Sequence, residues 1–115
     1  MVCTPQQVAL LDAIKAVDMY QKVNVPILGF VENMSGEIFG RGGAQKVAQE
    51  LKVPFLGEIP MNGCIREYCD RGKIMEMLTE ENPSRDALRN VCQNVAMQVF
   101  KELIKSPSGP LLEIL

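Results

Sequence analysis

The sequence contains no histidine. This absence removes the most common general base of enzymes and the most common metal ligand of proteins. It also excludes nucleophilic sites in which a histidine activates a serine or a cysteine. Any chemistry must therefore come from carboxylates, lysines or a bound nucleotide.

Long apolar runs and clusters of like charge are missing as well. No run approaches the roughly 20 residues that a membrane helix needs, and the N-terminus does not have the pattern of a secretion signal. The 12 basic and 14 acidic residues nearly balance and are not bunched, which argues against a nucleic-acid surface. We therefore expect a soluble, cytoplasmic protein that binds neither membranes nor nucleic acids.

The cysteines form no CxxC pair of the kind found in zinc and redox motifs. Cys64 and Cys69 lie five positions apart, a spacing that does not place two side chains together on one helix face. Reduced thiols are the default expectation, and the sequence offers no set of metal ligands. The four cysteines are Cys3, Cys64, Cys69 and Cys92.

What the sequence does contain is typical of one folded domain. The 115 residues are 47% hydrophobic and 23% charged, enough for one modest core. The central feature is an apolar run over residues 27–35 that stops abruptly in a polar loop. Because this run is continuously apolar, it predicts a parallel strand covered by helices on both faces.

A second run, residues 52–60, repeats this design with the same Val-Pro entry and a central glycine. Two such strands separated by a helix predict a βαβ unit, in which the strands are parallel. Their carboxyl ends then open on the same side, which is where ligands bind in open α/β sheets.

Helices are predicted around these strands. After a short strand at residues 1–3, Thr4 is expected to cap a helix, with Pro5 at its first position and Gln7 closing a capping box. This helix should end near Lys22, and its apolar stripe consists of Val8, Leu10, Leu11, Ile14 and Val17.

The glycine-dense residues 36–43 lack the spacing of a phosphate-binding loop, so we expect a flexible connector there, followed by a helix over 44–51. A short helix is expected over 64–72, and residues 73–79 are ambiguous. A long amphipathic helix should run from residue 84 or 85 to about Lys105, with a loose tail over 106–115. Its apolar stripe consists of Leu88, Val91, Cys92, Val95, Val99 and Leu103, with Cys92 as a small core residue.

Five segments together carry a family resemblance: residues 4–12 (TPQQVALLD), 25–35 (VPILG to ENMS), 38–44 (IFG, GGA), 53–60 (VPFLGEIP) and 65–72 (IRE, with Asp70 and Gly72). In this order they closely resemble the Mrp-type branch of the MinD-like P-loop ATPases, ATP-binding carriers associated with iron-sulfur cluster assembly. The resemblance implies an α/β fold, a partial parallel sheet with flanking helices. Residues 1–105 would form the C-terminal half of such a nucleotide-binding domain.

The resemblance also shows what is missing. In this family the phosphate-binding Lys and Ser/Thr, and the carboxylates for magnesium and water, lie in the N-terminal half, and this sequence has no Walker A motif. We therefore expect no catalytic residue and no ATP hydrolysis by this chain alone. Many relatives carry a CxxC pair where only Gly36 and Glu37 stand here, so an iron-sulfur cluster is not expected in this chain.

The base-binding residues can be carried over from the family. There, an Asn at the end of one strand and the proline-containing loop after the next flank the adenine of ATP, which implies Asn33, Pro60 and Met61 here. An amide can donate to and accept from the adenine edge, and Pro and Met offer apolar surfaces. The alternative is structural: Asn33 caps a loop and Pro60 ends a strand.

Two further hypotheses remain open. The chain could be a truncated, non-enzymatic interaction module that self-associates or docks on a partner protein through an exposed sheet edge or its long helix. Alternatively, Cys64 and Cys69 from two chains could form an iron-sulfur site, although their spacing matches no metal-binding pattern.

Overall fold

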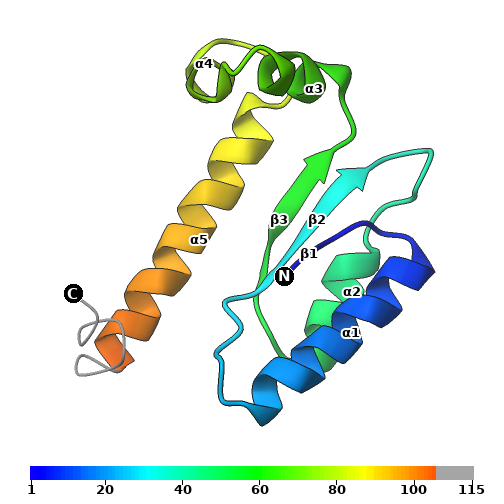
Figure 1. Ribbon diagram of the computed structural model, residues 1–115, viewed down its shortest axis with the longest axis vertical. Coiled ribbons are helices and arrows are strands. Elements are labelled where there is room, and N and C mark those ends of the chain that lie inside the picture. The colour runs from blue at the N-terminus through cyan, green and yellow to red at the C-terminus, as the bar shows by residue number, and fades with distance from the viewer. Residues whose placement is uncertain (106–115) are drawn as a thin grey trace.

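A three-stranded parallel sheet organises residues 1–105, the part of the chain that the computed structural model describes. Its order is β1 (Val2–Cys3), β2 (Phe30–Ser35) and β3 (Phe55–Pro60), with α1 (Gln7–Lys22) and α2 (Gly43–Leu51) as the connections. The helices α3 (Gly63–Asp70), α4 (Ile74–Thr79) and α5 (Arg85–Lys105) follow β3. This arrangement confirms the predicted α/β class (Figure 1). The predicted tail lies outside the described residues.

Two apolar clusters cover the two faces of the sheet. Phe30 packs with Val17 of α1 and Val47 of α2, whereas the next residue, Val31, packs with Val91 of α5. Because successive strand residues point to opposite faces, β2 is enclosed by helices on both sides. This confirms the prediction made from its continuous apolar run. Figure 1 shows α5 on one side of the strands and α1 with α2 on the other.

Both longer strands begin later than predicted, at residues 30 and 55 rather than 27 and 52. The helix before each strand leads into a residue with left-handed backbone, Asn24 at φ 61° and Lys52 at φ 58°. In each case the next backbone N–H donates to a carbonyl in the last turn of the helix, over 2.9 and 3.0 Å. At the end of α2, the helix exit therefore uses Lys52 and Val53, which the apolar pattern assigned to the second strand.

The predicted capping box at the start of α1 is wrong. Gln6 occupies the cap position with extended backbone and makes no side-chain cap hydrogen bond. The Thr4 hydroxyl instead donates to the side-chain oxygen of Gln6 over 3.2 Å. The helix therefore begins at Gln7, two residues after the predicted first position, Pro5. The predicted end at Lys22 is confirmed.

The buried face of α1 also differs from the predicted stripe. Val8 and Leu11 are 68% and 54% exposed, whereas Ala13 and Val17 are buried. Leu10 and Ile14 pack against the same cluster as Val17. The sheet thus contacts a face that is rotated away from Val8 and Leu11.

The long helix α5 extends beyond the sheet that it covers. Its 21 residues span about 31 Å, whereas the six residues of β3 span about 20 Å. Val91 is buried, Val99 and Leu103 are 37% and 39% exposed, and Cys92 is exposed. The prediction of Cys92 as a core residue is therefore wrong.

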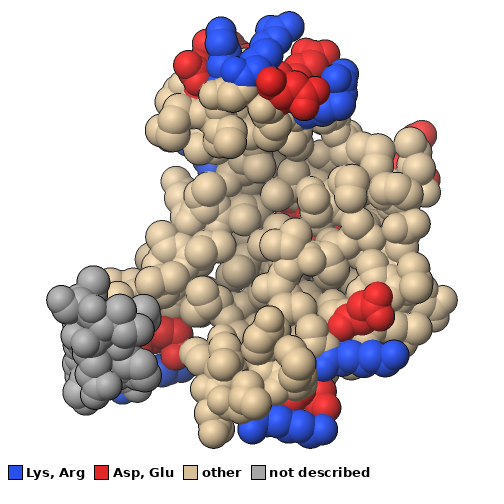
Figure 2. Space-filling model, viewed as in Figure 1, with Lys and Arg blue, Asp and Glu red and all other residues tan. Residues whose placement is uncertain are grey.

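Charged side chains are unevenly distributed over the surface. In Figure 2 they gather over α3 and α4 at one end and again near the opposite end, and the face between them is largely uncharged. Within residues 1–105, no helix combines the length and the apolarity that crossing a bilayer requires.

A buried carboxylate fixes the glycine-dense stretch between β2 and α2. Glu32 of β2 is fully buried, and its two oxygens accept the backbone N–H groups of Gly42 and Ala44, each over 3.0 Å. Gly36 and Gly40 exchange two backbone hydrogen bonds of 2.8 Å. Glu32 thus provides the N-terminal cap that Gly42 cannot provide, and its charge suits a helix N-terminus. The sequence predicted a flexible connector here, whereas in the structure the stretch is tied to the sheet by Glu32.

Gly29 should not tolerate a side chain. An added Cβ would lie 2.5 Å from the Pro54 carbonyl oxygen and 2.8 Å from Leu56 Cγ, and φ is 153°. Gly36 has a similar φ of 149°, but a Cβ added there would have no atom within 4 Å. Gly36→Ala is therefore a control with the same backbone conformation and no crowding. We expect Gly29→Ala to lower the free energy of unfolding by about 2 kcal/mol more than Gly36→Ala. Equal losses in urea unfolding would contradict this close packing.

Glu32→Gln should destabilise the protein because the amide has one acceptor for two backbone N–H groups. We expect a loss of about 2 kcal/mol in the free energy of unfolding, with faster hydrogen exchange at the amides of Gly42 and Ala44. Glu37→Gln is the control, since Glu37 lies exposed in the same stretch. If both variants were equally stable and equally protected, Glu32 would not anchor α2.

Candidate functional site

The candidate site lies where β2 and β3 end. Asn33 is opposite Ile59 and Ser35 is opposite Pro60 in the parallel register. The Met61 N–H then donates to the Ser35 carbonyl over 2.8 Å. Parallel pairing thus brings the three predicted residues, Asn33, Pro60 and Met61, to one edge of the sheet. Their role in binding a nucleotide stays a prediction.

One extra residue shapes this edge. Between the pairs formed by Asn33 and by Ser35, β2 contains one residue more than β3. This residue, Met34, has left-handed backbone at φ 56° and is 37% exposed. Bulges of this kind re-aim side chains. Together with Met61, which is 38% exposed, Met34 adds apolar surface at the strand ends.

The side chain of Asn33 is half-buried. The amides of Asn62, Asn82 and Asn94 are each engaged with backbone groups. The Asn33 amide, in contrast, makes no hydrogen bond with any other residue that the structure describes. Its donor and its acceptor are therefore available to a ligand.

Ser35 adds a polar group that the sequence pattern did not single out. Its side chain is buried, and within residues 1–105 the hydroxyl oxygen has no hydrogen-bond partner. A buried hydroxyl without a partner is costly, and such groups in native proteins usually meet water or a ligand. From the sequence alone, a serine after an apolar run indicates a turn. Only the strand register shows that Ser35 lies in β2, opposite Pro60.

The thiols differ in their surroundings. Cys3 is buried, and burial raises the pKa of its thiol; the Glu32 carboxylate adds to this rise and the N-terminal ammonium opposes it. Cys64 donates to the Ser84 hydroxyl oxygen over 3.3 Å, while Cys69 is exposed. Within the described part of the chain, no three Cys, Asp or Glu side chains group in a way that could hold a metal ion.

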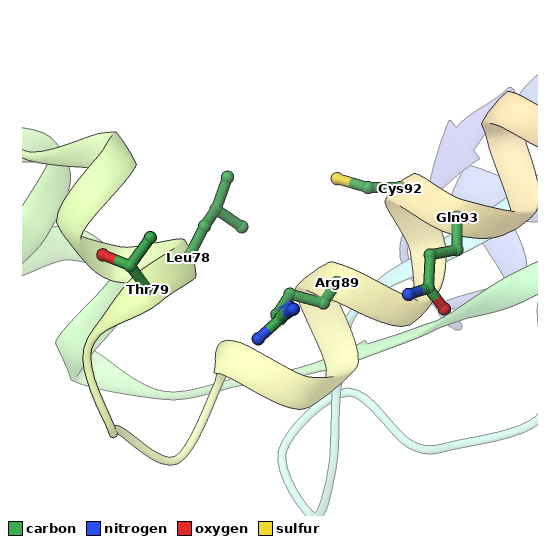
Figure 3. A pocket seen from close by; sticks show the side chains of 5 residues that line it. All are labelled: Leu78, Thr79, Arg89, Cys92 and Gln93. Atoms are coloured by element: carbon green, nitrogen blue, oxygen red, sulfur yellow. The ribbon is translucent and has the colours of Figure 1, made fainter.

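A separate cavity of about 510 Å³ opens between α4 and α5. The Cys92 thiol points across it toward α4, whereas the Thr79 side chain points away from α5 (Figure 3). The cavity is distinct from the strand ends, because its lining comes from these two helices alone. The lining residues are Leu78, Thr79, Arg89, Cys92 and Gln93.

Known proteins resemble this chain over most of its length. The model of a family described as ParA, NUBPL iron-transfer P-loop NTPase, matches residues 1–96. An iron-sulfur cluster carrier protein of Deinococcus radiodurans is 42% identical over 108 residues, covering 85% of this chain and 30% of that protein. The iron-sulfur cluster transfer protein NUBPL of Mus musculus is 39% identical over 116 residues, covering 92% of this chain and 35% of that protein. The chain thus spans about a third of the length of these relatives.

Solved structures agree with the fold. The cell division ATPase MinD of Pyrococcus furiosus matches with a TM-score of 0.67 and 26% identity, over 86% of this chain and 40% of that one. A nucleotide-binding protein of Archaeoglobus fulgidus in complex with ADP matches with a TM-score of 0.55 and 28% identity. The match covers 71% of this chain and 36% of that one. From the family match and these relatives we conclude that the chain belongs to the ParA family of NUBPL iron-transfer P-loop NTPases.

Proposed function

We propose that this chain supplies the adenine-binding side of the ATP site in a cytoplasmic, Mrp-type iron-sulfur cluster assembly ATPase. The observation that carries the proposal is the parallel register of β2 and β3, which sets Asn33 at the same sheet edge as Pro60 and Met61. The P-loop NTPase family and the ADP complex of the Archaeoglobus fulgidus protein support a nucleotide as the ligand class.

The chemistry of these residues suits a purine base. The free Asn33 amide can accept from the exocyclic amino group of adenine and donate to a neighbouring ring nitrogen. Met61 and Met34 are more than a third exposed, and thioethers pack favourably against aromatic rings. Pro60 contributes a rigid apolar surface at the end of β3. Together these groups would hold the base by its edge and its face.

The triphosphate requires residues of another kind. The sequence has no Walker A motif, and the relatives are about three times as long as the matched region. In this proposal an N-terminal half with a Walker A motif supplies the phosphate cradle, and the same half supplies the carboxylates for magnesium. The chain alone then binds ATP weakly and does not hydrolyse it.

The cluster that such carriers transfer would be cargo, and the proposal assigns no cluster ligand to this chain. Gly36 and Glu37 stand where many relatives have a CxxC pair. Cys64 is engaged with Ser84 rather than directed toward Cys69 as a second ligand.

The proposal is tested with a chimera that joins this chain to the Walker A segment of the Deinococcus radiodurans relative. Titration with a fluorescent ATP analogue and magnesium should show saturable binding by the chimera and little by the isolated chain. In the chimera, Asn33→Ala should weaken ATP binding about tenfold, because two hydrogen bonds to the base together contribute about 1.4 kcal/mol.

Asn90→Ala is the matched control for this substitution. Asn90 is exposed on α5, so its loss should leave ATP affinity unchanged. Two results would refute the proposal: equal ATP affinity of the Asn33→Ala and Asn90→Ala chimeras, or rapid ATP hydrolysis by the isolated chain.

A further inference from the structure

We infer that Met34 destabilises the fold and strengthens binding of the nucleotide base, because it holds a side chain in a backbone position that suits glycine. This inference rests on the proposed function and deepens it, since it assigns a measurable cost in stability to one of the residues that would contact the base. Two observations carry it: the backbone conformation of Met34 and the pairing of β2 with β3.

The backbone conformation of Met34 is the first observation. Of the non-glycine residues that the structure describes, three have left-handed backbone: Asn24 at φ 61°, Met34 at φ 56° and Lys52 at φ 58°. Asn24 and Lys52 lie at helix exits, where the next N–H donates back to the helix and this conformation is common. Met34 instead lies inside β2. Because the left-handed region is costly for a residue with a Cβ atom, the conformation of Met34 needs another explanation.

The pairing of β2 with β3 is the second observation. Asn33 and Ser35 are opposite consecutive residues of β3, Ile59 and Pro60. Met34 is thus the extra residue of a bulge. A bulge whose first residue is left-handed normally has glycine there, because glycine adopts this conformation without a steric cost. The fold alone would therefore be more stable with glycine at position 34.

The Met34 side chain lies at the edge where the base would bind. Three other residues of β2, Phe30, Glu32 and Ser35, are at most 1% exposed, whereas Met34 is 37% exposed. Backbone strain in native proteins gathers at ligand sites, and a thioether packs favourably on an aromatic ring. In the proposed site Asn33 would bind the edge of the base and Met34 its face. Loss of the Met34 side chain should therefore affect the base and not the phosphates.

Met34→Gly tests the inference, because a methionine that only supports the fold and one that binds the base give opposite results. The full chain with Met34→Gly should unfold at a higher urea concentration, since relief of the strain exceeds the entropy that glycine adds to the unfolded state. In the ATP-binding chimera described above, Met34→Gly should weaken ATP binding about fivefold. Binding of inorganic tripolyphosphate, measured by competition with the fluorescent ATP analogue, should be unchanged.

Two variants are matched controls. Lys52→Gly removes a side chain from the same left-handed conformation at an exposed helix exit. It should also raise the urea midpoint, but it should leave ATP affinity unchanged. Met34→Leu keeps both the strain and an apolar side chain of similar size, so its urea midpoint and its ATP affinity should stay close to those of the parent.

Three results would overturn the inference: a lower urea midpoint for Met34→Gly, equal losses of ATP and tripolyphosphate affinity in this variant, or an equal loss of ATP affinity in Lys52→Gly. The Asn33→Ala chimera separates the inference from the proposed function. If Asn33→Ala weakens ATP binding and Met34→Gly does not, the proposed function stands and the inference fails. If neither variant weakens ATP binding, both fail.

Discussion

The hydrogen bonds of the buried Glu32 carboxylate are the constraint on which the rest of this structure depends. They join the central strand to the first turn of α2, and α2 in turn packs on the same cluster as α1 and Phe30. A buried carboxylate is tolerated only when its oxygens are satisfied. Here the N–H groups of Gly42 and Ala44 donate to both carboxylate oxygens, and the carboxylate in turn caps the N-terminus of α2. The strand and the helix therefore hold each other in position.

From this anchored strand the functional edge follows by geometry. Parallel pairing makes β2 and β3 end together, and Met34 is an extra residue with left-handed backbone at the end of β2. The polar groups at this edge, Asn33 and Ser35, are not engaged by other side chains of the described region. Among the buried side chains of residues 1–105, the Ser35 hydroxyl alone has no hydrogen-bond partner, and an unpaired hydroxyl at a strand end is consistent with ligand binding there.

Much of this fold could be predicted from the sequence, because the decisive signals are local. The continuous apolar run of β2 predicted burial on both faces, and the repeated Val-Pro design predicted parallel strands. The misses have long-range causes. Cys92 is exposed because it points toward α4 while its neighbour Val91 packs on the sheet. Val8 is exposed because the sheet contacts another face of α1. The left-handed backbone of Met34 has no residue-type signal, since methionine rarely adopts it.

The anchoring of residues 36–42 also bears on how this fold can vary. Because the Gly36–Gly40 bridge and the Glu32 carboxylate fix the two ends of the stretch, added residues would extend outward and leave the sheet undisturbed. Lengthening such a loop is inexpensive, since each doubling costs only about 0.6 kcal/mol of closure entropy. The stretch is therefore a natural insertion point, at which a short peptide with new ligands could be gained or lost while the domain around it keeps its stability.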